Sequence, residues 1–152
     1  PLLIVANEFF DALPVRQFVK GKSGWHERMV GLADGRRAFG LAPTPIPEAA
    51  LPAELHNSPE GAIYEVSLAA ADVMQRLGTR IAAQRGALLA IDYGYEKTQS
   101  GETLQAVRHH AYADPLDSPG DIDLSAHVDF GALAKVATGL GLAVAPLTTQ
   151  RD

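Results

Sequence analysis

The sequence predicts an α/β fold built on a parallel sheet. Three observations lead to this prediction: apolar runs at residues 2–6, 87–91 and 142–145, amphipathic helical patterns at 67–84 and after Asp129, and the alternation of the two along the chain. A strand buried on both faces forms an unbroken apolar run, which is typical of parallel sheets. The order strand, helix, strand, helix, strand is that of a doubly wound sheet.

Composition narrows the possible functions. The chain has 152 residues, of which 47% are hydrophobic and 20% charged, as expected for one globular domain. Its formal net charge of -5 offers no basic surface for nucleic acid. Cysteine is absent, which excludes disulfides, zinc–thiolate sites and a thiol nucleophile. The apolar runs are all too short to cross a bilayer, so we expect no membrane insertion.

The two ends of the chain indicate a piece of a larger domain. The run at 2–6 follows Pro1 directly, and the run at 142–145 lies just before the last residues. A strand buried on both faces needs a neighbour on each side. The alternative is a small domain that begins with its first strand.

Between the first two apolar runs, the sequence predicts a β-rich insertion. Apolar and polar side chains alternate in residues 15–19 and 25–32, which predicts strands there. Residues 37–41, beyond Asp34-Gly35, are predicted to be the partner strand. That pair predicts a tight hairpin turn, because both its positions tolerate positive φ. Prolines recur through residues 43–59 and predict an irregular surface crossing.

The second half supplies the helices. Ser67 is the expected N-cap of the helix at 67–84, and Gly86 is its expected stop. Residues 103–109 read as a strand and 114–120 as a loop. Asp129 is the expected N-cap of the second helix. Apolar side chains fall on one face of each helix: Val66, Ala70, Val73, Met74, Leu77 and Ile81 in the first, and Phe130, Leu133, Ala134 and Ala137 in the second.

Polar and aromatic side chains follow two of the predicted strands. Asn7-Glu8-Phe9-Phe10-Asp11 comes after the first, and Asp92-Tyr93-Gly94-Tyr95 comes after the second. Ligands of open α/β sheets bind beyond the carboxyl ends of the strands, so these segments predict a site. Carboxylates hold amines and cations, and aromatic faces attract cations. Taken singly, each segment also reads as a turn or a helix cap.

Histidines give a weaker signal. His127 and Asp129 are candidates for an acid–base pair, although Asp129 equally reads as a helix cap. His109 and His110 are adjacent on a predicted strand and would point to opposite faces, which disfavours a shared metal. Metal-binding spacings such as HxH, HExxH and CxxC are absent, as is the GxSxG elbow of serine hydrolases.

The chain contains no GxGxxG loop after a strand and no P-loop. Gly139-Leu140-Gly141 follows a helix and reads as a C-cap. A nucleotide-type cofactor in such a sheet normally sits over the first βα turn. If the sheet uses such a cofactor, we expect its loop upstream of Pro1.

Five segments carry a resemblance to a known family. They are Ala6-Asn7-Glu8-Phe9-Phe10-Asp11-Ala12-Leu13-Pro14-Val15, Trp25-His26-Glu27-Arg28, Ile91-Asp92-Tyr93-Gly94-Tyr95, Thr103-Leu104-Gln105-Ala106-Val107-Arg108 and Ala126-His127-Val128-Asp129-Phe130. In this order they resemble the MidA family of S-adenosylmethionine-dependent methyltransferases. Its mitochondrial members are assembly factors of respiratory complex I that methylate a protein arginine.

The resemblance implies the C-terminal part of a class I methyltransferase, a Rossmann-like fold with a seven-stranded, mostly parallel sheet. In that frame residues 2–6, 87–91 and 142–145 are strands four, five and six. Residues 15–41 are a hairpin insertion and 43–59 a Pro-rich crossing. The glycine-rich loop for S-adenosylmethionine and the acid that holds the ribose would precede Pro1.

The implied reaction needs a carboxylate to orient a guanidinium and favour its deprotonation. We expect Glu8, Asp11 and His127 to be catalytic. Asn7, Phe9, Asp92, Tyr93 and Tyr95 are expected to contact substrate or cofactor, and Phe10 is expected to line the pocket. For Phe10 and Tyr95, plain packing in the core is the open alternative. Two alternatives remain open: a non-catalytic assembly or binding protein that keeps the fold, and a nucleotide-dependent dehydrogenase with a similar sheet.

The resemblance also implies partners and a compartment. We expect a protein substrate, with a respiratory complex I subunit as the candidate, and no nucleic acid. The compartment would be the cytoplasm in a bacterium and the mitochondrial matrix in a eukaryote. If upstream strands are missing, the bare edge at residues 2–6 would pair with a second copy, exchange strands or lower solubility.

Overall fold

The structure is a computed structural model that describes residues 1–151. It divides into two compact units. Unit 1 comprises Pro1–Leu13, Leu68–Thr98 and the segment that starts at His127, and unit 2 comprises Pro14–Ser67 and Gln99–Ala126. Each unit therefore draws on separate stretches of the chain, and each has its own hydrophobic core.

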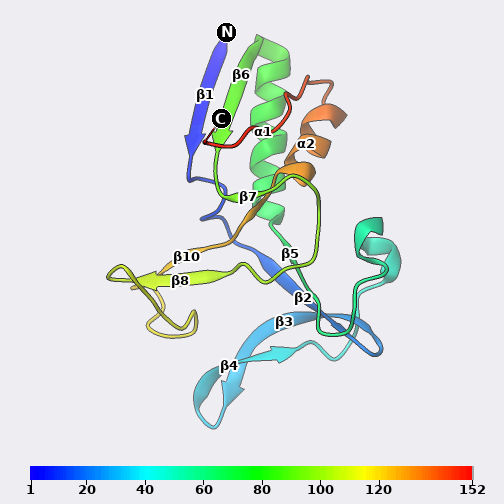
Figure 1. The fold of residues 1–152 in the computed structure, drawn as a ribbon, viewed down its shortest axis with the longest axis vertical. Helices are drawn as coiled ribbons and strands as arrows, with labels where there is room; N and C mark the ends of the chain where they lie inside the picture. Colours follow the sequence, from blue (N-terminus) through cyan, green and yellow to red (C-terminus); the bar gives the residue numbers. More distant parts are fainter. Residues whose placement is uncertain (152) are drawn as a thin grey trace. The chain divides into compact units, whose positions relative to one another are not determined.

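Unit 1 is built on two parallel strands. Strand β1 (Leu2–Asn7) pairs with β6 (Gly86–Ile91) along its whole length, from Leu2↔Gly86 to Asn7↔Ile91. Helix α1 (Leu68–Gln84) leads into β6 and lies beside the pair (Figure 1). The predicted parallel pairing of the first two apolar runs is confirmed.

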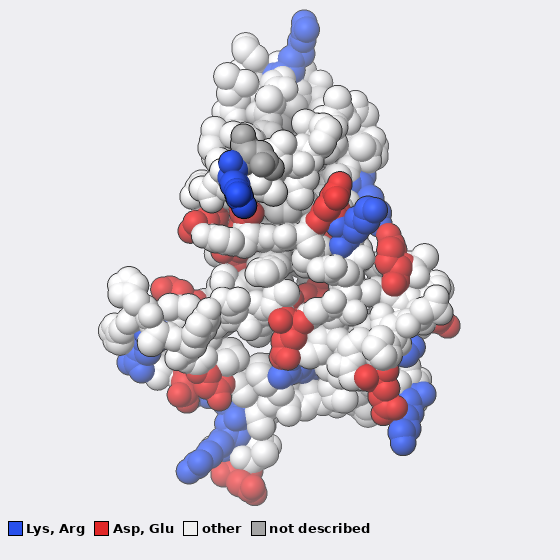
Figure 2. Space-filling view, viewed as in Figure 1, with Lys and Arg blue, Asp and Glu red and all other residues white. Residues whose placement is uncertain are grey.

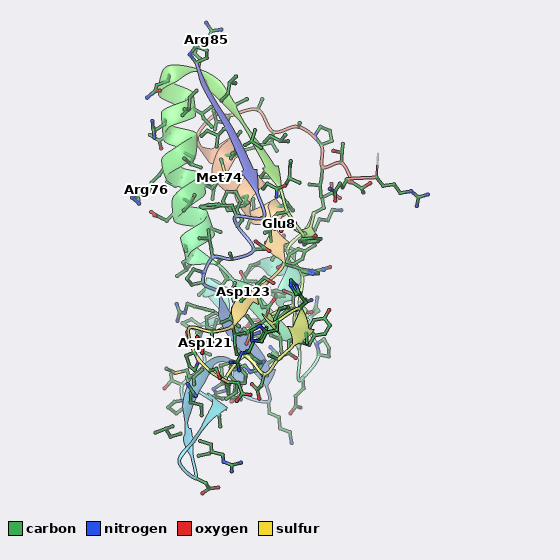
Figure 3. The ribbon with its side chains drawn as sticks, turned by 90° about the vertical axis from the view of Figure 1, so that its left-hand side faces the viewer. Glu8, Met74, Arg76, Arg85, Asp121 and Asp123 are labelled. Atoms are coloured by element: carbon green, nitrogen blue, oxygen red, sulfur yellow. The ribbon has the colours of Figure 1, made fainter. Side chains whose placement is uncertain are left out.

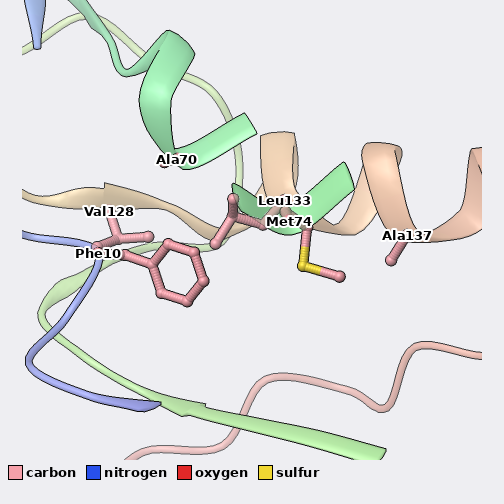
Figure 4. Close-up of a cluster of buried hydrophobic side chains, with 6 residues drawn as sticks. All are labelled: Phe10, Ala70, Met74, Val128, Leu133 and Ala137. Carbon is pink, nitrogen blue, oxygen red and sulfur yellow. The ribbon is translucent and has the colours of Figure 1, made fainter. Parts of the chain in front are cut away.

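The core of unit 1 lies between α1, α2 (Phe130–Gly139) and the strand ends. Since α1 carries apolar side chains at helical spacing, one stripe of it faces inward. Figure 4 shows this cluster, which consists of Phe10, Ala70, Met74, Val128, Leu133 and Ala137. The predicted inner faces of both helices thus contribute to the core, with Ala70 and Met74 from the first and Leu133 and Ala137 from the second.

Strands β1 and β6 bury one face only. Leu2, Ile4 and Ala6 are half-buried, whereas Leu3 is 76% and Val5 70% exposed. The prediction that this strand is covered on both faces is therefore wrong for the described residues. Period-2 alternation places successive side chains on opposite faces, and in residues 1–151 only one face receives a covering layer.

Residues 142–145 do not form the predicted third strand. They are irregular in the structure, although Leu142 packs against the core of unit 1 and Val144 is 47% exposed. A strand forms only when its backbone N–H and C=O groups find a neighbouring strand. Within residues 1–151 no such neighbour pairs with this segment.

Helix α1 ends at Gln84, as predicted, but Gly86 is not the residue that turns the chain out of the helix. The left-handed position is Arg85, with φ of 59°, and Gly86 already begins β6. Glycine is needed there for space: a Cβ atom at this position would lie 1.9 Å from the carbonyl oxygen of Leu2. Gly86 thus permits the close start of the β1–β6 pairing.

Unit 2 is mainly an antiparallel sheet. Its order is β4 (Arg36–Leu41), β3 (Gly24–Ala33), β2 (Arg16–Gly21) and β5 (Ile63–Val66). Asp34 and Gly35 have φ of 51° and 75°, as expected for the predicted hairpin turn. Phe18, Trp25, Leu51, Leu55 and Tyr64 form its core.

The Pro-rich crossing is irregular but is not confined to the surface. It includes the 3-10 helices η1 (Glu48–Ala50) and η2 (Ala53–Leu55). Leu51 and Leu55 are buried in the core of unit 2. Surface placement was the wrong expectation here, since two leucines among the prolines cover one face of the sheet.

A second antiparallel sheet in unit 2 joins β8 (Gln105–Arg108) with β9 (Ala111–Tyr112) and β10 (Asp123–Ser125). His109 and His110 form the turn between β8 and β9, with φ of 51° and 62°. The prediction that they alternate on a strand is therefore wrong, because left-handed residues break the strand.

A buried carboxylate joins the two parts of unit 2. Glu65 is 4% exposed and accepts hydrogen bonds from Gln17 Nε2 at 2.7 Å and from the backbone N–H of Leu104 at 3.0 Å. The hydroxyl and backbone N–H of Thr103 donate to it as well. These donors satisfy a charge that would otherwise be costly to bury.

Positive and negative side chains are mixed on the face in view. Figure 2 shows Lys and Arg side chains dispersed among Asp and Glu on the face in view, without a continuous basic area. Neither helix within residues 1–151 is long and apolar enough for a bilayer crossing.

Candidate active site

The carboxyl ends of β1 and β6 lie at the same level. Asn7 pairs with Ile91, and the backbone N–H of Glu8 donates to the Ile91 carbonyl at 2.9 Å. The residues that follow each strand therefore start side by side, at the strand spacing of about 4.8 Å. Figure 3 shows Glu8 just beyond the end of β1, at the opposite end of that strand from Arg85.

Glu8 has a left-handed backbone, with φ of 45°. This conformation costs a non-glycine residue roughly 1 kcal/mol, and such strain is retained where the surroundings fix it. The Glu8 side chain is exposed, and the hydroxyl of Tyr93 donates to its Oε1 at 3.4 Å. Two residues from the two predicted segments thus meet.

Asp92 binds the turn that follows β1. Its Oδ2 accepts hydrogen bonds from the backbone N–H groups of Phe9, Phe10 and Asp11 at 3.2, 2.9 and 3.3 Å. Its Oδ1 accepts from the N–H of Tyr93 at 2.9 Å. The carboxylate is therefore engaged by four backbone amides.

Asp11 is the most perturbed acid of the site. Burial raises the pKa of its carboxyl above the usual value, and the negative charges of Asp92 and Glu8 raise it further. The backbone N–H of Ala12 partly offsets this rise. Its Oδ1 is buried and accepts no hydrogen bond from the described residues. Such a group is suited to hold or accept a proton.

The segment around His127 reaches the same edge of unit 1. Strand β11 (Val128–Asp129) pairs in parallel with β7 (Gly94–Tyr95), and the N–H of Val128 donates to the Tyr93 carbonyl at 2.8 Å. A Cβ atom on Gly94 would lie 2.1 Å from the Val128 carbonyl oxygen, so this approach needs glycine. The exposed His127 thus directly precedes β11, the strand that pairs with the segment after Asp92.

Asp129 caps α2. Its Oδ1 accepts from the N–H of Ala132 at 2.8 Å, and its Oδ2 accepts from the hydroxyl of Thr98 at 2.7 Å. The N-cap interpretation of Asp129 is confirmed. Both oxygens are engaged, so we assign no proton transfer to this residue. Thr98 is buried beneath the cap, and no sequence motif pointed to this residue.

The aromatic residues of the two segments divide between core and surface. Phe10 is 2% exposed and belongs to the core. Its ring contacts the ring of Phe9 edge-on, with 5.2 Å between the ring centroids. Phe9 is 43% and Tyr93 60% exposed, so both rings are available to a ligand. Tyr95 is half-buried beside α2, and Asn7 is exposed.

The described residues also form a hollow of about 150 Å³ in unit 2. It contains none of the predicted site residues, being lined by Lys20, Ser23, Gly24, Trp25, Pro45, Ile46, Glu48 and Leu51. The perturbed acid and the strained turn coincide instead at the strand ends of unit 1, which we therefore take as the candidate site.

Comparison with known proteins shows the family of the chain. Residues 1–148 match a family model described as an S-adenosyl-L-methionine-dependent methyltransferase. The chain belongs to this family. The match covers both units, and with it the acidic turn after β1 and the segment after β6.

Curated relatives carry a more specific name. The protein arginine methyltransferase NDUFAF7, mitochondrial, of Danio rerio is 33% identical over 97% of this chain and 35% of its own length. The proteins of the same name from Mus musculus and Homo sapiens are 36% and 35% identical, over 33% and 32% of their lengths. The chain thus spans about a third of the relatives that it matches.

Solved structures show the same fold. A Burkholderia thailandensis protein with bound S-adenosyl-homocysteine matches with a TM-score of 0.75 and 31% identity, over 91% of this chain and 38% of that one. Another Burkholderia thailandensis structure gives a TM-score of 0.77 at 31% identity. The predicted fold class, a partial Rossmann-like methyltransferase sheet, is confirmed.

Proposed function

We propose that the protein carrying this chain is an S-adenosylmethionine-dependent methyltransferase that acts on a protein arginine. The observation that supports this most is the acidic turn at the ends of β1 and β6. It presents Glu8 to solvent and places the partly buried Asp11 beside it. The name of the curated relatives supports the arginine assignment.

The chemistry of these residues fits a reaction at a guanidinium. A carboxylate binds a guanidinium through paired charge-assisted hydrogen bonds, and the exposed Glu8 is placed to do so. Asp11 has an unpartnered buried oxygen and a raised pKa, so it is suited to accept the proton that the nitrogen loses. His127 is the candidate to pass that proton to solvent.

The same residues are suited to form one side of a binding site for the cofactor. The sulfonium of S-adenosylmethionine is a cation, and the exposed carboxylate and aromatic rings here suit a cation. When bound, the cofactor supplies an activated methyl group. Asn7, Phe9, Tyr93 and Tyr95 would line the pocket, orient the substrate and exclude water, and positioning of this kind accounts for much of the rate. The remaining contacts are expected from residues outside this chain.

The partner and the compartment of this protein are proposed from the names of its relatives and from the sequence resemblance. A protein substrate fits the name of the curated relatives, and a respiratory complex I subunit is the finer candidate from the sequence resemblance. The relatives are named mitochondrial. We propose the mitochondrial matrix if the source is a eukaryote and the cytoplasm if it is a bacterium.

The decisive experiment is Glu8→Gln in the complete gene product. The probes are S-adenosyl-homocysteine for binding and synthetic peptides that each contain one arginine for methyl transfer, with matching lysine peptides. We expect binding within about threefold of wild type, and methyl transfer slower by roughly 10²–10⁴-fold because the guanidinium loses its carboxylate.

Glu96→Gln is the matched control, since it neutralises another exposed glutamate of unit 1. This variant should keep wild-type turnover. A wild-type protein that binds the cofactor but methylates no peptide or protein would favour the non-catalytic alternative. Unchanged turnover in Glu8→Gln would remove Glu8 from the mechanism.

A further inference from the structure

Three consecutive backbone amides converge on a single oxygen of Asp92. They belong to Phe9, Phe10 and Asp11, and they converge because Glu8, directly before them, is left-handed. Successive amides in such a turn form a concave anion-binding nest. In many proteins a nest of this kind holds the anion of a ligand. Here the carboxylate of Asp92 already fills it.

The position of Asp92 makes this contact possible. It is the first residue after β6, and its partner turn is the first after β1. Strand pairing at Asn7↔Ile91 brings the two together, although the hydrogen bond to Phe10 joins residues 82 apart in sequence. The contact therefore fixes the acidic turn to the end of the sheet.

Asp92 also acts on Asp11 through its charge. The charged groups that affect the Asp11 carboxyl are Asp92, on the turn after β6, and Glu8, on its own turn. Burial of Asp11 is the largest cause of its raised pKa, and the charge of Asp92 is the next. Removing that charge should let Asp11 ionise at lower pH.

We propose that Asp92 is a positioning residue for the reaction proposed above: it fills the nest, holds Glu8 in its left-handed conformation and maintains Asp11 next to a fixed negative charge. The inference rests on the proposed function. It differs from a direct contact between Asp92 and substrate or cofactor, because both oxygens of Asp92 already accept backbone amides.

The test is Asp92→Asn in the complete gene product. An amide keeps the size of the carboxyl but loses the charge, and its NH₂ faces one set of amide donors. We expect kcat to fall by about 10–100-fold, with KM for S-adenosylmethionine within about threefold. The limb of the kcat–pH profile that reports Asp11 should move to lower pH, and hydrogen exchange of residues 9–11 should accelerate.

Asp72→Asn is the matched control. It removes one exposed charge from the outside of α1, where Asp72 pairs with Arg76 at 3.5 Å. It should change neither the pH profile nor the exchange of residues 9–11. A purely structural role for Asp92 would lower kcat without moving the profile.

Several results would overturn the inference. The first is that Asp92→Asn keeps the kcat and the pH profile of the wild type. The second is that Asp92→Asn loses cofactor affinity by the same factor as kcat. If Asp92→Asn does not fold, the wild-type protein still decides: with uniform ¹⁵N labelling, the amides of Phe9 and Phe10 should exchange as slowly as those of β1. Rapid exchange there contradicts the inference. Because exchange needs no turnover, it separates this inference from a failure of the proposed function.

Discussion

Three carboxyls at the ends of β1 and β6 lie in different environments in spite of their similar chemistry. Glu8 is exposed, Asp11 is partly buried with a raised pKa, and Asp92 accepts four backbone amides. Environment, not residue type, separates the three carboxyls. An exposed acid suits a cationic substrate, a buried one suits a proton, and a fully hydrogen-bonded one suits the support of the turn.

The raised pKa of Asp11 predicts how stability depends on pH. The folded state favours the neutral carboxyl, so the contribution of Asp11 is fully present below its ordinary pKa of 3.8. As the pH rises above that value, the unfolded chain ionises first, and the free energy of unfolding falls until the raised folded pKa is passed. Above that point the contribution is constant.

Asp11→Asn should remove this dependence. From about pH 3 upward, the free energy of unfolding of the variant should increasingly exceed that of the wild type, and the difference should then level off. Denaturant titration of both proteins at each pH measures this difference. The same variant should slow methyl transfer at least about tenfold, if Asp11 takes the proton. A difference that stays constant with pH would contradict the raised pKa.

Among the elements, α2 depends on the N-cap residue that precedes it. Asp129 both caps the helix and accepts the buried hydroxyl of Thr98. Asp129→Ala should therefore destabilise unit 1 by about 1–2 kcal/mol, since it removes the cap and leaves Thr98 without this partner. The midpoint of thermal unfolding should fall by roughly 2–4 °C per kcal/mol.

Asp129→Asn is the control for this prediction, because asparagine caps helices about as well as aspartate. It should lose clearly less stability than Asp129→Ala. Combining Asp129→Ala with Thr98→Val should cost less than the sum of the single changes, since the two side chains share one hydrogen bond. Additive losses would show that the Thr98 contact adds nothing.

At the scale of the whole molecule, we propose that the chain forms one side of a cofactor site. We predict that the 152-residue chain alone binds S-adenosylmethionine only weakly, because the contacts expected from a glycine-rich loop are not in its sequence. Calorimetric titration of the purified chain measures this. Micromolar binding by a monomer would show that the cofactor site has been misplaced.

The exposed face of the β1–β6 pair predicts that the chain alone associates with further copies. Leu3, Val5 and Leu89 are 76%, 70% and 56% exposed, so the chain alone should associate through this face or through the edge of β1. Light scattering of the purified chain, beside the titration, would show this association.

The sequence by itself determined the local features of the fold. Apolar runs located β1 and β6, helical periodicity located α1 and α2, and Asp34-Gly35 located the hairpin turn. It also placed Glu8, Asp11, Asp92 and His127 at strand ends or beside them. These features depend on neighbours a few residues away, so a pattern of residue types is enough to predict them.

Only the tertiary structure decided which side chains are engaged. Asp92 reaches the amides of residues 9–11, more than 80 positions distant, and Phe10 points into the core while Phe9 stays exposed. Residues 142–145, apolar as a strand would be, are irregular because no described strand pairs with them. Backbone pairing, burial and pKa depend on contacts distant in sequence, which the order of residue types along the chain does not specify.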